Sequence, residues 1–179
     1  MTQLVATEKG ILKSYLTFQL NEEKFAVNVG QVIEIVEVPN ITKIPNSPTY
    51  LLGVINLRGS ILPVVDARIK FGLKANEYTV NTCILVLQLL LDDEQIMLGA
   101  LVDAVNEVFD VEQEQIQPFP AIGTSYKAEF IKGVIKDKDQ FVFILNIDKV
   151  FSVMEMESIK IVQENIIGTD KKENQKTVE

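Results

Sequence analysis

The strongest constraint on the fold is an internal repeat. Shifted by 80 positions, residues 50–71 align with residues 130–151 without a gap, and a Gly-Val-Ile triplet recurs in both. Shifted by 73 positions, residues 29–38 align with residues 102–111. Two blocks in the same order predict a duplicated unit of roughly 70 residues. A unit of that length buries only about 60% of its unfolded surface, so we expect the two units to pack together through an apolar interface bordering a groove.

Alternation of apolar and polar residues predicts that each unit consists of short strands. Residues 15–20 alternate clearly, and a polar turn at 21–24 leads into a second strand at 25–29. Residues 29–38 fit a short helical turn that runs into a strand. Further strands are expected at 53–57, 61–65, 83–91, 96–102 and 105–111. Because no amphipathic crossover helices separate these runs, the pattern favours two small antiparallel barrels over a parallel sheet.

The ends of the chain differ in character from its middle. We expect a flexible N-terminus at 1–13, and a polar stretch at 74–81 that divides the β region into two subdomains, with strand exchange between them left open. Residues 153–168 carry apolar side chains at a spacing that is typical of an amphipathic helix. Residues 169–179 are rich in charge and lack aromatics, which predicts a disordered tail.

Composition excludes several classes of chemistry. The chain has no His and a single Cys, Cys83, so it can hold neither a Ser-His-Asp triad nor a zinc site built on His or thiolate ligands. Its 25 acidic and 17 basic residues give a net charge of −8, which repels nucleic acid and anionic lipid. The most apolar run, 83–91, is too short to cross a membrane. We therefore expect a cytoplasmic protein without cofactor, nucleic-acid partner or direct membrane insertion.

Paired carboxylates are the candidates for enzymatic chemistry. They occur at 92–94, at Glu112 with Glu114 and at Asp137 with Asp139. All lie in polar segments between strands, where a solvated turn is the ordinary interpretation. A hydrolase would need two acids in an enclosed pocket, and an oligonucleotide-binding barrel would need a basic, aromatic-rich face. The sequence favours neither.

Arg58 and Glu34 are the charged residues that the pattern singles out. Arg58 lies at a predicted hairpin tip beside Gly59, where its guanidinium can bind a carboxylate through two hydrogen bonds. Glu34 interrupts an apolar run, which a purely structural segment rarely tolerates unless the charge is paired or at an edge. We expect an ion pair between them, against the alternative that Arg58 is an ordinary exposed turn residue.

A longer motif resembles a known family. The run GVINLRGSILPVVDARIKFG at 53–72 follows YLTFQL and VGQVIEI and precedes ALVDAVNEV. Over residues 14–152 the chain resembles the CheW-like family of chemotaxis coupling proteins. The resemblance implies a mainly β fold of two SH3-like five-stranded antiparallel β-barrels packed together, with short helices.

The resemblance also implies a function. It implies a non-catalytic scaffold, at membrane-associated receptor arrays, joining the cytoplasmic tips of methyl-accepting chemoreceptors to the regulatory domain of the histidine kinase CheA. An adaptor for a different receptor array or a non-chemotactic histidine kinase remains the alternative. The kinase-binding residues stay unassigned. The positions that match the family's receptor-binding groove are Val32, Glu34, Gly53, Arg58, Val105 and Val108.

Overall fold

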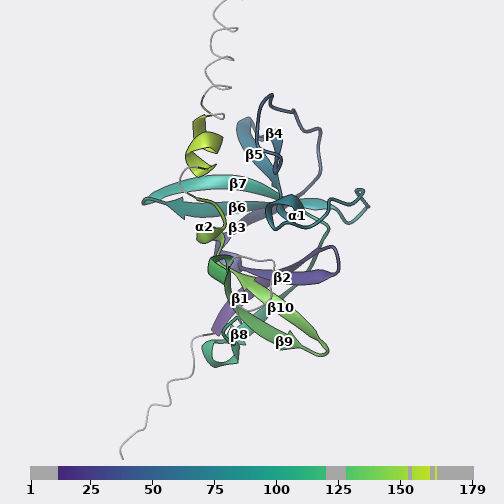
Figure 1. The fold of residues 1–179 in the computed structure, drawn as a ribbon, viewed down its shortest axis with the longest axis vertical. Helices are drawn as coiled ribbons and strands as arrows, with labels where there is room; N and C mark the ends of the chain where they lie inside the picture. The colour runs from purple at the N-terminus through teal and green to yellow at the C-terminus, as the bar shows by residue number, and fades with distance from the viewer. Residues whose placement is uncertain (1–11, 120–127, 153–154, 162–163, 165–179) are drawn as a thin grey trace, which may run out of the picture.

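Ten strands form two curled five-stranded sheets that stack along the long axis of the molecule (Figure 1). The computed structural model describes residues 12–119, 128–152, 155–161 and 164. The first sheet has the order β8-β1-β2-β10-β9, with β1 (Leu12–Leu20), β2 (Glu23–Asn28), β8 (Ala104–Glu112), β9 (Ile131–Asp137) and β10 (Gln140–Leu145). The second has the order β3-β6-β7-β5-β4, with β3 (Val32–Glu37), β4 (Leu51–Leu57), β5 (Ser60–Asp66), β6 (Cys83–Leu91) and β7 (Glu94–Val102).

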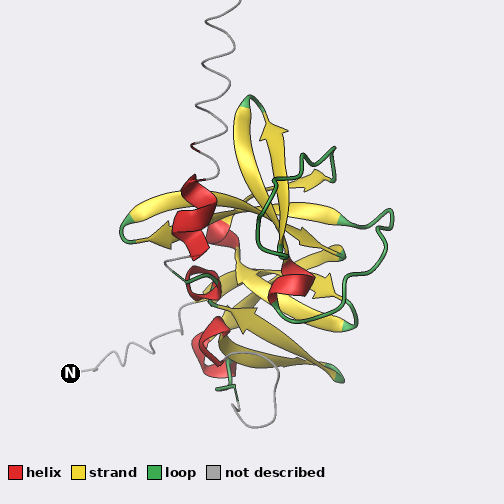
Figure 2. Ribbon diagram, turned by 45° about the horizontal axis from the view of Figure 1, so that its top comes forward, coloured by secondary structure: helices red, strands yellow, loops and turns green. Residues whose placement is uncertain are grey.

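Helices are few and short (Figure 2). The described ones are η1 (Val29–Gln31), α1 (Ala67–Lys70), η2 (Gln113–Gln115), η3 (Ala128–Phe130), α2 (Ile147–Val150) and a helical segment at 155–161. The mainly β fold class is therefore confirmed, as is the helical turn that leads into the strand after residue 31. Each sheet departs from a purely antiparallel arrangement at one pair, β2 with β10 and β5 with β7, which run parallel.

The two sheets are built by exchanging hairpins between the two repeats. The first repeat runs from β1 to α1, and the second, from β6 to α2, likewise has five strands followed by a short α-helix, although the 3-10 helices lie at different places. Hairpin β1–β2 of the first repeat pairs with β8 and β10 of the second. Hairpin β6–β7 of the second repeat pairs with β3 and β5 of the first. Each parallel pair lies where an exchanged hairpin joins its new sheet.

Because of this exchange, the chain passes from one sheet to the other within each repeat. Residues 74–81, the expected division, separate the two repeats, yet they connect α1 to β6 within the second sheet. The chain crosses between sheets at η1 and again at Asp103. The division predicted near 74–81 thus lies between the two repeats, and the strand order places strands of both repeats in each sheet.

A shared apolar core joins the sheets. It draws on both repeats and includes Phe18, Phe25, Phe71 and Phe130. The ring centroids of Phe25 and Phe71 lie 5.5 Å apart, and those of Phe71 and Phe130 lie 6.0 Å apart. Each curled sheet also encloses a smaller, separate core, around Tyr15 in the first sheet and around Val86 in the second. The predicted apolar interface between the two units is therefore present.

The described residues reach a short way into both expected terminal segments. Strand β1 begins at Leu12, so the last two residues of the expected flexible segment are ordered in a sheet, and residues 1–11 lie outside the described part. Residues 155–161 are helical, within the helix expected at 153–168. The tail expected at 169–179 also lies outside the described residues.

The C-terminal helical segment is attached to the rest of the molecule by apolar and charged contacts. Met156 and Ile159 are buried in the shared core. Lys70 Nζ lies 2.8 Å from Glu155 Oε1 and 4.8 Å from the ring centroid of Tyr50. No helix in the described part of the chain is long and apolar enough to span a membrane.

Candidate functional site

The β4–β5 hairpin presents Arg58 at its tip. Arg58 and Gly59 both have positive φ, +51° and +86°, which suits a tight turn between two strands. The Gly59 N–H donates a 2.8 Å hydrogen bond to Asn56 Oδ1, which closes the turn. The backbone therefore holds Arg58 outward from the end of the second sheet.

Glu34 from strand β3 holds the Arg58 side chain in place. Arg58 Nη2 lies 2.8 Å from Glu34 Oε2, so the predicted ion pair is present. The Glu34 side chain is 21% exposed, whereas that of Arg58 is 79% exposed. An exposed pair of this kind contributes only about 0.2–1 kcal/mol to stability. Its clearest effect is to orient a cation whose remaining N–H groups face solvent.

Val32 and Val105 occupy related positions in the two repeats, where β3 and β8 begin. Both side chains are partly buried and pack against the shared core, one from each sheet. Val108 lies further along β8, opposite Leu16 of β1, and is exposed. The structure thus places Val32 and Val105 at the margin of the same core, and Val108 at an exposed position on the face of β8 that it shares with Leu16 of that core.

Gly53 has a structural explanation that involves no partner. Its φ is +143°, and a Cβ built there would lie 2.0 Å from the carbonyl oxygen of Thr42. The backbone N–H and C=O of Val54 pair with those of Thr42, both at 2.9 Å. Gly53 is buried and lets this segment approach β4 closely. This close approach gives Gly53 a role in supporting the hairpin, and its place in the receptor-binding groove stays a prediction.

Two exposed apolar residues of β3 were missed by the sequence reasoning. Ile33 and Ile35 are 46% and 47% exposed on the face opposite Val32 and Glu34. The signal was available, because residues 32–37 carry apolar side chains at both odd and even positions. In a strand, that pattern leaves one apolar face to be covered or exposed.

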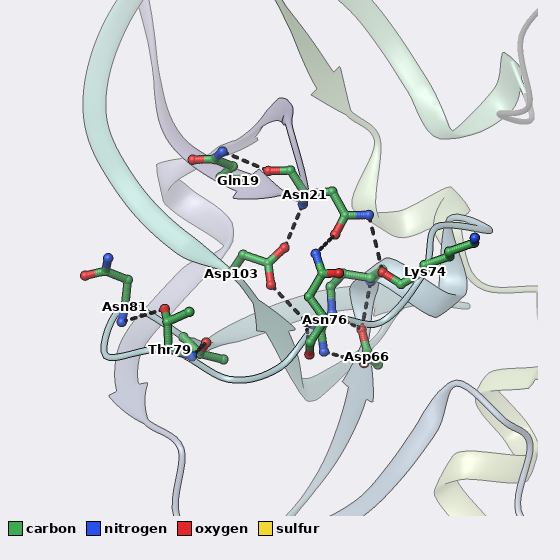
Figure 3. Close-up of polar contacts among 10 residues, drawn as sticks. Gln19, Asn21, Asp66, Lys74, Asn76, Thr79, Asn81 and Asp103 are labelled. Atoms are coloured by element: carbon green, nitrogen blue, oxygen red, sulfur yellow. Dashed lines mark hydrogen bonds and ion pairs between the residues drawn. The ribbon is translucent and has the colours of Figure 1, made fainter.

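A buried ion network was also missed. The Arg68 side chain of α1 is 1% exposed and lies 2.9 Å from carboxylate oxygens of both Asp66 and Asp103. The hydrogen bond to Asp66, opposed by burial and reinforced by the charges of Asp66 and Asp103, raises the pKa of Arg68. The guanidinium therefore stays protonated. A polar hollow of about 810 Å³ adjoins this network, lined in part by Asn21, Asn76 and Asp103 (Figure 3).

Comparison with known proteins places this architecture in a family. The model of the CheW-like domain matches residues 14–155, which include both sheets and the start of the C-terminal helical segment. The chain belongs to the CheW-like domain family.

Similarity to individual CheW proteins extends over most of the chain. Chemotaxis protein CheW of Rhizobium meliloti is 36% identical, over 82% of this chain and 92% of that relative. Chemotaxis protein CheW of Klebsiella aerogenes is 32% identical, over 80% of this chain and 84% of that relative. The crystal structure of the scaffolding protein TtCheW from Thermoanaerobacter tengcongensis superposes with a TM-score of 0.71 at 31% identity, covering 82% of this chain and 92% of that one.

Proposed function

We propose that this CheW-like protein is a non-catalytic scaffold that couples chemoreceptors to the regulatory domain of the chemotaxis histidine kinase CheA. Its relatives named chemotaxis protein CheW, and the scaffolding protein with the same fold, support the general role. Coupling would take place in the cytoplasm, at membrane-associated receptor arrays. The adaptor binds both partners and carries out no covalent step.

The exposed and oriented guanidinium of Arg58 is the observation that supports a receptor-binding role for this surface. A long cationic side chain usually loses rotamer entropy when a partner binds it. Here Glu34 already restricts the guanidinium at 2.8 Å, while most of the side chain stays accessible. A helix bearing carboxylate or amide groups at the receptor tip could accept hydrogen bonds from the free N–H groups.

Val32 and Val105 supply the apolar part of the proposed surface. An amphipathic helix from the receptor tip would lay its apolar side chains against them, at the junction of the two sheets. Val108 would extend this contact along β8. Coupling further requires that the receptor's signalling states contact the surface differently, because equal affinity for both states transmits nothing.

Titration calorimetry tests the proposal. The protein is titrated separately with the CheA regulatory domain and with a soluble fragment of a receptor tip, each from the same cell. We expect micromolar binding to both, with Arg58→Ala weakening only the receptor titration. Lys43→Ala, which removes an exposed cation from the loop before β4, is the matched control. Absence of binding to both partners would overturn the assignment, and binding of the receptor alone would redirect it to another histidine kinase.

A further inference from the structure

Asp103 occupies the point where the chain passes from the second sheet to the first. It lies between the end of β7 and the start of β8. Its backbone N–H donates to the carbonyl oxygen of Gln19 at 3.0 Å. Its Oδ2 accepts a 2.6 Å hydrogen bond from the N–H of Asn21, in the β1–β2 turn (Figure 3). Asp103 is thereby fixed to the first sheet.

The other oxygen of the same carboxylate faces the second sheet. Asp103 Oδ1 accepts from Arg68 Nη1 at 2.9 Å. Arg68 is itself anchored within its own sheet, because its Nε and Nη2 donate to the two oxygens of Asp66 at 3.0 and 2.9 Å. Arg68 Nη1 also donates to the carbonyl oxygen of Asn76 at 2.9 Å. One carboxylate thus links the β1–β2 turn of the first sheet to α1, which follows β5 of the second sheet.

The related crossover, at η1, is held differently. Gly30 stands at the position that corresponds to Asp103, and Asp148 at the position that corresponds to Arg68. Asp148 Oδ1 accepts from the backbone N–H of Leu90 at 3.0 Å and from Gln31 Nε2 at 3.2 Å. These bonds are exposed, and no cation takes part in them. Among the described residues, the joint at Asp103 thus contains an ion pair and is partly buried, whereas the joint at Asp148 is exposed and its carboxylate accepts from uncharged donors.

We propose that Asp103, held by Arg68, is a positioning residue that sets the orientation of the two sheets relative to each other. The shared core holds the sheets together, but apolar contact has no preferred direction. Hydrogen bonds, in contrast, are directional. Here a fork-shaped guanidinium and a backbone N–H both donate to the same carboxylate, which fixes their relative positions. In some proteins, buried ionic or polar groups specify one arrangement rather than add stability.

This joint lies next to the proposed receptor groove. Asp103 precedes Val105 by two residues, and Val32 begins the strand that follows the other crossover. A change in the angle between sheets would move Val32 and Val105 relative to each other. We infer that the joint keeps the groove in its binding-competent shape, a step that rests on the proposed function.

Distances between spin labels test the positioning role without any partner. Nitroxide labels are placed at Ser60 and Gln140, exposed positions at the starts of β5 and β10, in a Cys83→Ser background. Asp103→Ala removes the link but leaves the Arg68–Asp66 pair in place. We expect a shifted or broadened distance distribution, with a smaller change for Asp103→Asn, which retains one acceptor oxygen.

Asp110→Ala is the matched control. Asp110 lies on β8 and accepts a hydrogen bond from Ser14 of β1, so its loss stays within the first sheet. The control should leave the distribution unchanged. If Asp103→Ala and Asp103→Asn both retain a cooperative unfolding transition and the wild-type distribution, the proposal is overturned.

Calorimetry then separates this inference from the proposed function. Asp103→Ala should weaken binding of the receptor fragment by roughly threefold to thirtyfold, the range over which such networks modulate coupling, and leave the kinase titration unchanged. Equal affinity of wild type and Asp103→Ala for the receptor fragment would overturn the groove step. If the wild-type protein fails to bind the receptor at all, the proposed function fails, whereas the label distances still decide the role of Asp103.

Discussion

Gly53 and Gly133 occupy related positions in the two sheets, and each lies directly under a neighbouring segment of backbone. A Cβ at Gly53 would lie 2.0 Å from Thr42 O, and a Cβ at Gly133 would lie 2.9 Å from Gln117 O. Val54 and Val134, the next residues, form the matching isolated bridges to Thr42 and Gln117. The repeat therefore preserves a detailed packing arrangement as well as the order of strands.

Substitution at Gly53 should destabilise the protein strongly. In Gly53→Ala the methyl group would overlap a backbone carbonyl at a φ of +143°, so β4 or residue 42 must move. We expect a loss of at least about 3 kcal/mol in the free energy of unfolding, measured by denaturant titration. Gly59→Ala is the comparison, because its φ is +86° and no atom lies within 4 Å of the added Cβ. It should cost only about 1 kcal/mol, and equal losses at both sites would contradict the packing explanation.

Exchanging the charges of Arg58 and Glu34 should separate stability from binding. The double variant Arg58→Glu, Glu34→Arg can re-form the ion pair, so its melting temperature should lie close to the wild-type value. Receptor affinity should nevertheless fall by about tenfold or more, because the exposed group has become an anion. Thermal denaturation and calorimetry measure the two effects. Retained affinity in the double variant would show that the pair supports the hairpin and does not contact the receptor.

The bond between Lys70 and Glu155 should make stability depend on pH. Burial acts to raise the pKa of Glu155, but hydrogen bonds from Lys70 and Ser152 outweigh it and lower the pKa overall. A carboxyl group with a lowered folded-state pKa adds stability above its unfolded value, about 4.3, and this contribution is lost as pH falls through the folded value.

Glu155→Gln tests this dependence. The variant should be less stable than wild type at neutral pH, and the difference should shrink as the solution is acidified through the lowered folded-state pKa of Glu155. Denaturant titrations across this range measure it, with Glu157→Gln, an exposed position of the same helical segment, as the control. A difference independent of pH would exclude the ionised carboxylate as its source.

Loss of a ring in the shared core should destabilise both sheets together. Phe25 is fully buried between Phe18 and Phe71, with ring centroids at 5.9 and 5.5 Å. Phe25→Ala should cost about 3–5 kcal/mol. Amide hydrogen exchange in β6 of the second sheet should accelerate along with that in β1. Val86→Ala, in the separate core of the second sheet, should affect mainly the second sheet. If Phe25→Ala accelerates amide hydrogen exchange in the first sheet alone, the two sheets unfold independently.

The sequence predicted local features well, because hairpins and strands depend on neighbouring residues. Alternation located β1 and β2, and Arg58-Gly59 located the β4–β5 turn. The ion pair of Glu34 and Arg58 was inferred from a charge in an apolar strand, and the structure contains it. The strand and turn signals lie within a few residues of the features that they predict, whereas the ion pair joins residues that are 24 apart in the chain.

Features that depend on distant segments escaped prediction. From the sequence, Arg68 is a polar residue in a short helical turn. Its burial depends on a partner, Asp103, that lies 35 residues later in the chain. Gly53 matches a binding position by motif, yet the approach of Thr42 explains it without a partner. The strand order, likewise, cannot be read from alternation, since each hairpin has the same pattern whichever sheet it joins.

The exchange of hairpins also has a consequence for synthesis on the ribosome. Strands β3 to β7 are consecutive, so the second sheet can close as soon as its own residues have emerged. Hairpin β1–β2 emerges first but needs β8 and β10, and the last residue of β10 comes 117 residues after Asn28. At about 5–20 residues per second, that wait lasts roughly 6 to 23 seconds, far longer than a hairpin takes to form. During this interval Phe25 can contact Phe18 and Phe71 but lacks Phe143, so part of its apolar surface stays exposed until β10 has emerged.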